Sequence, residues 1–299
     1  MTDVIIDVKH LGRDAYVASY LFDTPAGPVL LDPGPGSTLA TLRAGLESQG
    51  LQVTDLKAVL LSHIHFDHAG AIGLLVAEHP DLPVYVHERG APHLVDPTKL
   101  LASATQVFGD RMDYLWGPFL PVPADRIRAL QGGEQVTFGS RSFEVLYTPG
   151  HASHHVTYLE RATDTAYVGD VGGIRLPWLP VALPVTPPPD FSLERWLASL
   201  DAIEAWKPRR IFSTHFGFSD DLATHFAQLR HGLHDWTEAG GRLLESPGTD
   251  AERAAAFEQH VLGSLADKAT QDLVDRAALF SDYKASWYGI ARYHRKKAQ

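Results

Sequence analysis

The sequence predicts an α/β fold with a helical C-terminal extension. Short apolar segments typical of buried strands recur between residues 4 and 213, and segments with helical spacing lie between them. Several of these strands are followed directly by histidine or aspartate, whereas only helical patterns follow residue 219. We therefore expect an α/β domain over residues 1–218 and a helical extension over residues 219–299 that packs on it.

The first half of the chain contains five predicted strands: Val4–Val8, Tyr16–Phe22, Pro28–Leu31, Lys57–Leu61 and Pro83–Val86. A glycine- and proline-rich turn over residues 32–36 follows the third strand. Ser37 is placed to cap a helix over residues 38–49, which ends before Gly50. A second helix, over residues 70–79, ends at Pro80.

Residues 90–125 differ in character from the segments around them. Five prolines are mixed with Phe108, Tyr114, Trp116 and Phe119, and no single period holds throughout. We interpret this segment as an insertion of short helices and loop. It serves either as a lid over the site or as packing over an edge of the core.

The second half of the chain contains five further predicted strands: Glu134–Phe138, Ser142–Tyr147, His155–Glu160, Thr165–Val168 and Arg209–Ser213, the last core strand. Residues 172–189 are predicted to be loop, and Ser192 to cap the helix after it. Three more helices are expected over residues 220–239, 249–263 and 267–280, with a capping box at Thr249 and Glu252. The basic tail from Arg292 to Lys297 is expected to be solvated and partly frayed.

Composition excludes several classes of function. The net charge of −10 provides no cationic field for nucleic acid or anionic lipid. The chain has no cysteine, which excludes disulfides, iron–sulfur clusters and thiol nucleophiles. Neither a leader pattern nor an apolar run of membrane-spanning length is present, so a cytoplasmic protein is expected.

The most informative segment is His63-Ile64-His65-Phe66-Asp67-His68, directly after an apolar strand. Imidazole and carboxylate groups suit Zn²⁺, Fe²⁺ or Mn²⁺. Desolvating several such groups without a ligand costs free energy. The segment therefore predicts a metal site.

Four more polar residues end apolar strands: Asp32, His151, Asp170 and His215. Side chains at strand ends converge at one edge of a layered sheet. With the histidine segment they offer seven ligand groups besides Asp32, too many for one tetrahedral ion and suited to two metals. The candidate ligands are His63, His65, Asp67, His68, His151, Asp170 and His215.

The order of these residues resembles the metallo-β-lactamase superfamily of metallohydrolases over about 70% of the chain. The resemblance implies an αββα sandwich with a binuclear site at the sheet edge. It implies one metal on His63, His65 and His151, and the other on Asp67, His68 and His215. In the same way it implies that Asp170 bridges the metals and that Asp32 orients a ligand by hydrogen bonding.

Single residues of this chain differ from those typical of some branches of the superfamily, and these differences indicate which branch it resembles most. The chain lacks the cysteine ligand of some lactamases, and His65 stands where the diiron flavoproteins have glutamate. The hydrolase branch of glyoxalase II and acyl-homoserine lactonase type is the more similar, although Ala71 and Ile72 depart from the lactonase continuation. Phe66 replaces the small residue typical of the tRNA-processing nucleases.

The expected function is hydrolysis of a small ester, lactone or thioester by a metal-bridging hydroxide. Asp67 and Asp170 are the candidate catalytic carboxylates, and Asp170 is placed to move a proton to the leaving group. A phosphodiesterase or nuclease acting through the same two metals is the alternative. A non-catalytic binding protein is the other class, but it would be expected to have lost ligands.

Residues outside the ligand set complete the prediction. His154 is either a hydrogen-bond donor to substrate or a solvent-facing loop histidine. The candidate pocket residues are Phe66, Trp116, Phe119 and Trp178. Two divalent ions are expected, zinc first and iron or manganese as alternatives. The partner is a small molecule, and a homodimer is predicted from four aromatic residues near the C-terminus: Tyr283, Trp287, Tyr288 and Tyr293.

Overall fold

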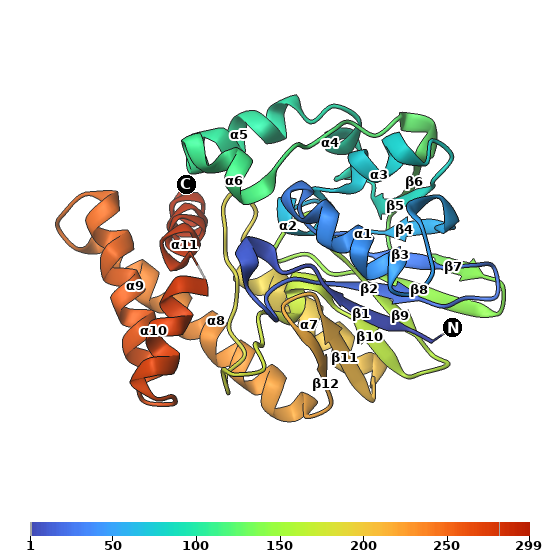
Figure 1. Ribbon diagram of the computed structural model, residues 1–299. Coiled ribbons are helices and arrows are strands. Elements are labelled where there is room, and N and C mark those ends of the chain that lie inside the picture. The colour runs from blue at the N-terminus through green and yellow to red at the C-terminus, as the bar shows by residue number, and fades with distance from the viewer. Residues whose placement is uncertain (1, 281) are drawn as a thin grey trace.

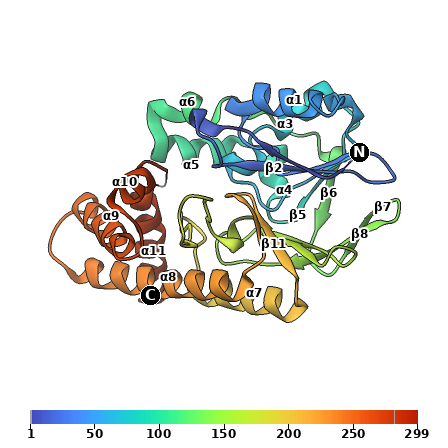
Figure 2. The same cartoon turned by 60° about the horizontal axis from the view of Figure 1, so that its bottom comes forward.

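Two six-stranded sheets face each other in the computed structural model, which describes residues 2–280 and 282–299. Helices cover the outer face of each sheet, so the layers run helix, sheet, sheet, helix (Figures 1 and 2). The predicted αββα sandwich is confirmed.

The first sheet has the order β1-β2-β3-β4-β5-β6. Its strands are β1 Val4–Asp7, β2 Ala18–Phe22, β3 Val29–Leu31, β4 Ala58–Leu60, β5 Val84–His87 and β6 Ile127–Leu130. β1, β2 and β3 are antiparallel neighbours, whereas β3 to β6 run parallel. The ends of β3 and β4 therefore lie side by side, which sets the site residues after them at one edge. The sequence did not predict β6.

The second sheet has the order β12-β11-β10-β9-β8-β7. Its strands are β7 Gln135–Phe138, β8 Arg141–Tyr147, β9 Val156–Glu160, β10 Thr165–Tyr167, β11 Arg210–Ser213 and β12 Gly217–Ser219. β10 and β11 are parallel, so the residues that follow them also share an edge. The prediction that residues 209–213 form the last core strand was wrong, because β12 pairs antiparallel with β11 beyond them.

Three apolar layers hold the sandwich together. The layer between the sheets is built on aromatic side chains, among them Tyr20, Phe22, Tyr158, Tyr167 and Phe212. A second layer joins the first sheet to helices α1 Leu39–Glu47 and α3 Ile72–Glu78. A third joins the second sheet to α7 Leu193–Trp206 and to the C-terminal helices. In the described residues the connections also contain 3-10 helices: η1 His10–Gly12, η2 Gly36–Thr38, η3 Val53–Asp55, η4 Gly109–Arg111, η5 Ala124–Arg126 and η6 Gly169–Gly172.

The cap predicted for α1 was wrong. Thr38 precedes the helix and makes no side-chain capping bond. The hydroxyl of Ser37 instead donates to the carbonyl oxygen of Leu115, at 2.9 Å. The sequence could not show this contact, because its partner lies in the distant insertion.

Residues 90–125 form three helices, α4 Ala91–Val95, α5 Thr98–Phe108 and α6 Met112–Trp116, followed by an irregular return. Leu94, Phe119 and Val122 are buried in the core of the first sheet. The segment therefore packs over the core, and its role as a lid stays a prediction.

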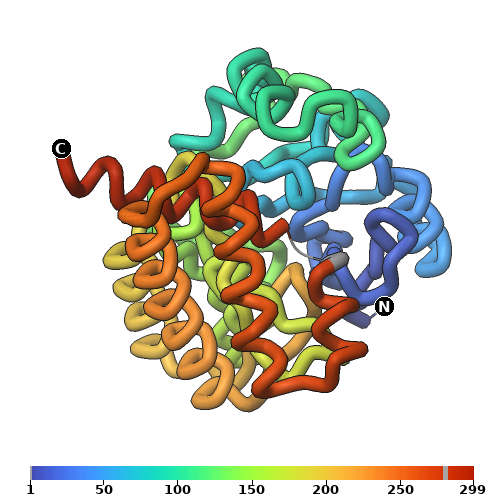
Figure 3. Tube along the Cα trace, turned by 90° about the vertical axis from the view of Figure 1, so that its left-hand side faces the viewer, coloured from blue at the N-terminus to red at the C-terminus, as the bar shows by residue number. Residues whose placement is uncertain are grey.

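Four C-terminal helices lie side by side against the sandwich: α8 Leu222–Glu245, α9 Asp250–Ala266, α10 Gln271–Phe280 and α11 Tyr283–Lys297 (Figure 3). The frayed tail was a wrong prediction, because α11 is helical to Lys297. Tyr283, Trp287 and Tyr293 are buried in the chain's own core, and Tyr288 alone of the four aromatic residues is exposed. These aromatics thus pack internally, and the homodimer stays a prediction. None of the helices in the described residues is long and apolar enough to cross a membrane.

Candidate metal centre

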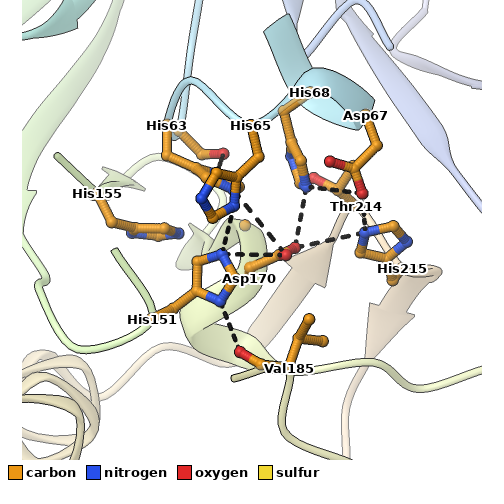
Figure 4. Close-up of polar contacts among 12 residues, drawn as sticks. His63, His65, Asp67, His68, His151, His155, Asp170, Val185, Thr214 and His215 are labelled. Carbon is orange, nitrogen blue, oxygen red and sulfur yellow. Dashed lines mark hydrogen bonds and ion pairs between the residues drawn. The ribbon is translucent and has the colours of Figure 1, made fainter. Parts of the chain in front are cut away.

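All seven candidate ligands meet at one edge of the sandwich (Figure 4). The first sheet supplies four of them, two from the loop after β4 and two from the helix α2 Phe66–Ala69. The second sheet supplies three, which follow β8, β10 and β11. Their ligand atoms form two groups, His63, His65, His151 and Asp170 in one and Asp67, His68 and His215 in the other.

The first group brings three imidazole nitrogens together. His65 Nδ1 lies 3.0 Å from His63 Nε2 and 2.9 Å from His151 Nε2. His151 Nδ1 faces the carbonyl oxygen of Val185 at 2.7 Å, which only accepts, so Nδ1 carries the proton and Nε2 presents a lone pair inward. The Ser62 hydroxyl donates its one proton to Asp32, so His63 Nδ1 must donate to Ser62 Oγ, at 3.0 Å. His63 Nε2 therefore also presents a lone pair.

The second group has the same construction. His215 Nε2 lies 3.3 Å from Asp67 Oδ2, and His68 Nε2 lies 3.9 Å from the same oxygen. His215 Nδ1 donates to the carbonyl oxygen of Tyr16 at 2.7 Å, which again turns the Nε2 lone pair inward.

Asp170 connects the two groups through its two oxygens. Oδ2 lies 3.4 Å from His151 Nε2 and 4.0 Å from His63 Nε2. Oδ1 lies 3.0 Å from His68 Nε2 and 3.5 Å from His215 Nε2. Each oxygen thus faces one group, which is the geometry of a bridging carboxylate.

Asp32 holds the surrounding structure in place. Its Oδ2 accepts from His68 Nδ1 at 2.8 Å, from Ser62 Oγ at 2.7 Å and from Thr214 Oγ1 at 2.9 Å. Its Oδ1 accepts from the Ser62 amide at 2.8 Å. Asp32 is fully buried, and its hydrogen bond holds the Nδ1 side of the His68 ring in place.

The carboxylates set the charge of the second group. Burial lowers the pKa of His68, but the charges of Asp170, Asp67 and Asp32 outweigh it and raise that pKa well above its usual value. Burial favours protonation of Asp170, yet the imidazoles of His68 and His215 hold its pKa well below the usual range. In the first group burial dominates, and it lowers the pKa of His65 to about 3. The imidazoles of the first group are therefore neutral, whereas His68 in the second group is protonated and lies between the ionised carboxylates of Asp67 and Asp170.

These residues fit divalent metal ions. Within the described part of the chain, His68 Nε2 and Asp170 Oδ1 are buried and face each other at 3.0 Å as an ion pair, and neither makes a hydrogen bond of regular geometry. The inward lone pairs of His63 and His151 meet at His65 Nδ1, which can donate to only one of them. A cation in each group satisfies these atoms at once, and the nitrogen and oxygen donors suit zinc, iron or manganese.

A residue that the sequence analysis passed over supports the bridging carboxylate from behind. His155 is fully buried, receives the amide proton of Val171 on Nε2 at 3.3 Å, and contacts Thr148 Oγ1 through Nδ1 at 2.9 Å. Gly169 has a φ of 47°, and a Cβ there would lie 2.7 Å from His155 Nε2. Glycine and histidine together thus fix the turn that carries Asp170.

The site opens towards Asp67 and His65. The Asp67 side chain is 23% exposed, whereas those of His63, His68, His151, Asp170 and His215 are at most 4% exposed. His65 is partly exposed as well. A substrate therefore reaches the ligand atoms from this side.

Three of the four predicted pocket residues contact one another, and Phe66 and Phe119 among them are buried in the core of the first sheet. Phe66 contacts the rings of Trp116 and Phe119, with centroids 5.8 Å and 5.1 Å away. Trp178 lies elsewhere, with the guanidinium of Arg276 4.2 Å above its ring.

His154 is not solvent-facing: its side chain is buried, and contacts with neighbouring groups hold its ring. It is 9% exposed, stacks on His63 with centroids 6.1 Å apart, and accepts from the Ile64 amide at 3.4 Å. Its role towards substrate stays a prediction.

Two aromatic residues near the site, His10 and Tyr16, were not identified as site residues from the sequence. Tyr16 was assigned to a strand, but β2 begins at Ala18, and its ring contacts His215 with centroids 5.7 Å apart. His10 stacks on Tyr16. No periodic pattern marks this loop, so the sequence offered no signal beyond the residue types.

Comparisons with known proteins agree with this geometry. Residues 12–215 match the family described as the metallo-beta-lactamase superfamily. The metallo-beta-lactamase fold-containing protein ST1585 of Sulfurisphaera tokodaii is 27% identical over 192 residues, 63% of this chain and 68% of that protein. A hydroxyacylglutathione hydrolase of Bdellovibrio bacteriovorus is 30% identical over 167 residues, 56% of this chain and 52% of that enzyme. The chain thus spans only about half the length of that relative.

Solved structures show the same fold. The metallo-beta-lactamase family protein TTHA1429 from Thermus thermophilus superposes with a TM-score of 0.69 and 22% identity, over 94% of this chain and 89% of that one. TTHA1623, solved in a di-iron-bound form, gives a TM-score of 0.54 and 29% identity over 72% of this chain and 94% of that one. Because the family match covers more than half of this chain, the chain belongs to the metallo-beta-lactamase superfamily of hydrolases.

Proposed function

We propose that this protein is a binuclear metal-dependent hydrolase of small esters, lactones or thioesters. The observation that carries the proposal is the pair of ligand groups joined by Asp170, each facing one of its oxygens. Two metals bridged in this way, when bound, supply an activated water and polarise the group under attack.

The chain's own residues hold and orient this centre. His63, His65 and His151 would hold one metal, and Asp67, His68 and His215 the other. The carbonyl oxygens of Val185 and Tyr16 fix the tautomers of His151 and His215, so the ligand nitrogens need no rearrangement to bind. Asp67 is the exposed carboxylate of the centre and is placed to receive or return a proton as substrate and product exchange.

The surroundings favour a small acyl compound over a nucleic acid. Phe66, next to Asp67 in the chain, packs with the aromatic rings of Trp116 and Phe119, and such an apolar cluster near the ligands suits an apolar group of the substrate. The net charge of −10 disfavours a polyanion. Hydroxyacylglutathione hydrolases among the similar proteins support a thioester as one member of the substrate class.

The test begins with metal content, measured by elemental analysis on protein purified without chelator or nickel. We expect about two equivalents per chain, with zinc as the proposed ion and iron and manganese as the other metals assayed. The loaded protein is then assayed on matched phenyl acetate, S-phenyl thioacetate, γ-butyrolactone and bis-phenyl phosphate.

Hydrolysis of one of the first three, lost in Asp170→Asn, supports the proposal. Hydrolysis of the phosphodiester alone would replace it with the phosphodiesterase function. Less than one metal equivalent after reconstitution would refute the binuclear centre.

A further inference from the structure

Two stacked rings outside the ligand set, His10 and Trp116, lie beside the opening of the metal centre. His10 is 2% exposed, and its ring is sandwiched between Tyr16 and Trp116. The centroid distances are 5.8 Å and 5.4 Å, and the planes are tilted by only 17° and 11°. Figure 2 shows the dark-blue turn η1, which carries His10, beside α6, which carries Trp116.

Both rings carry a buried polar atom without a partner. Within the described residues, His10 Nδ1 and Trp116 Nε1 make no hydrogen bond. An indole N–H can only donate, and burying it unpaired costs free energy. Unsatisfied groups on two directly stacked rings beside a site indicate that a bound molecule supplies their hydrogen-bond partner.

The chain holds the two rings there by unusual means. Lys9 and Leu11, on either side of His10, have left-handed backbone angles, with φ of 50° and 55°. Such strain at non-glycine residues persists where the surrounding structure imposes it, and it is frequent at ligand-binding sites. The Ser37 hydroxyl donates to the carbonyl oxygen of Leu115, next to Trp116, which ties the end of α6 to η2.

One ring separates the pair from the candidate ligands on each side. Tyr16, which stacks on His10, contacts the ring of His215, and its carbonyl oxygen accepts the Nδ1 proton of that histidine. Phe66, which contacts Trp116, lies between His65 and Asp67 in the chain. Burial, with a smaller opposing effect of the Asp67 charge, lowers the pKa of His10 to about 4, so its imidazole is neutral at pH 7.

We propose that His10 Nδ1 and Trp116 Nε1 bind an uncharged oxygen acceptor of the substrate, separate from the carbonyl that is cleaved. The inference rests on the proposed function for calling this ligand a substrate. With His10 in its Nδ1–H tautomer, an ether, ester or amide oxygen accepts from both N–H groups. A carboxylate would be desolvated there against two neutral donors and close to the charge of Asp67, which is unfavourable. The pair therefore selects uncharged substrates with a second oxygen.

The test uses two inert anilides that differ in one atom. N-phenylmethoxyacetamide has an ether oxygen where N-phenylbutyramide has a methylene, and both keep the carbonyl. Binding to the zinc-loaded protein is measured by calorimetry for the wild type, His10→Phe and Trp116→Phe. Each variant keeps an aromatic ring in the stack: His10→Phe removes both ring nitrogens, and Trp116→Phe removes the indole N–H together with its five-membered ring.

We expect the wild type to bind the ether compound about three- to tenfold more tightly than the butyramide, and each variant to lose most of this preference. Trp287→Phe is the matched control, because Trp287 Nε1 is also buried without a partner in the described structure but lies in the C-terminal helices. It should keep the preference. Metal content and circular dichroism should be unchanged in all three variants.

Hydrolysis of phenyl methoxyacetate and phenyl butyrate separates the two proposals. With the wild type active, we expect both variants to raise KM for the methoxyacetate and to leave kcat within about twofold. Activity on both esters with an unchanged anilide preference in the variants overturns the role of His10 and Trp116 and leaves the proposed function standing. The role of His10 and Trp116 is also overturned if the wild type binds the two anilides equally well or binds neither of them. If the wild type prefers the ether anilide but hydrolyses neither ester, the binding site formed by His10 and Trp116 stands and the proposed function is refuted.

Discussion

Replacing Asp32 by asparagine tests whether one buried carboxylate supports the metal centre. Asparagine has the same shape and tolerates the left-handed backbone at this position, where φ is 48°, so the change adds no strain of its own. Its amide nitrogen accepts no hydrogen bond. With the amide oxygen in place of Oδ2, which receives three donors, the Ser62 N–H loses its acceptor.

The magnitude follows from these four bonds. A buried N–H left unpaired costs about 1–3 kcal/mol, and each of the three remaining bonds loses a charged acceptor worth about 1 kcal/mol more than a neutral one. Because the terms are not additive, we expect a loss of about 3–5 kcal/mol in the free energy of unfolding. That is a large fraction of the roughly 5–15 kcal/mol of a typical domain.

The assay is urea unfolding of the metal-free protein, followed by a competitive zinc titration. Replacing the charged acceptor of His68 Nδ1 by a neutral amide oxygen should weaken zinc binding about 10- to 100-fold. Asp221→Asn is the control, because Asp221 caps α8 at the surface by accepting from the Thr224 amide and asparagine caps equally well. A loss below about 1 kcal/mol in Asp32→Asn would refute the reasoning.

Three further predictions follow from the site. Asp170→Asn should reduce bound metal from about two equivalents to one or fewer, because an amide is a poor bridge; elemental analysis showing two equivalents contradicts the bridging role. Chelation should lower the thermal midpoint of unfolding, because a free metal concentration a hundredfold above Kd adds about 2.7 kcal/mol per site to the free energy of unfolding. An unchanged midpoint in scanning calorimetry would contradict metal binding by the folded chain. Burial lowers the pKa of His225 from 6.5 to about 4, so the unfolded chain takes up a proton in this window while the folded chain does not. The free energy of unfolding therefore has its full value above pH 6.5 and falls by up to roughly 3 kcal/mol as the pH drops towards 4. Urea unfolding measured across this pH range should show a weaker dependence of the free energy of unfolding on pH in His225→Asn than in the wild type. Equal pH dependence in the two proteins would contradict this.

Most of the metal centre was predictable because its residues follow strands. Asp32 and His63 follow the parallel pair β3 and β4, and Asp170 and His215 follow the parallel pair β10 and β11. Once the apolar strands were recognised, the edge at which they end, and hence the cluster, followed from sheet geometry.

The loop that carries His10 could not be predicted in the same way. Its left-handed residues include Lys9 and Leu11, types that carry no local signal for such a conformation. The contact of His10 with Trp116 joins segments more than a hundred residues apart, and only the folded chain brings them together.

The helix α11 was missed for a different reason. Its buried stripe of Trp287, Ile290 and Ala291 alternates with cations that end in Arg295 and Lys297. The charges suggested a solvated tail, but the stripe faces α8 and α9 while the cations point outward, with Arg295 bonded to Asp250.

The metal centre also joins the two sheets, which ties its occupancy to the stability of the fold. Thr214, after β11, donates to Asp32, after β3, and its carbonyl oxygen accepts from the amide of Ala18 in β2, at 2.9 Å. The amide of Val156 in β9 donates to the carbonyl oxygen of Ser62 at 2.8 Å. The candidate ligands divide along the same line, four from the first sheet and three from the second. Because these hydrogen bonds between the sheets involve no metal ion, we expect the metal-free chain to keep its sandwich. Because bound ions would cross between the sheets at the same place, each would add its binding free energy to that of folding.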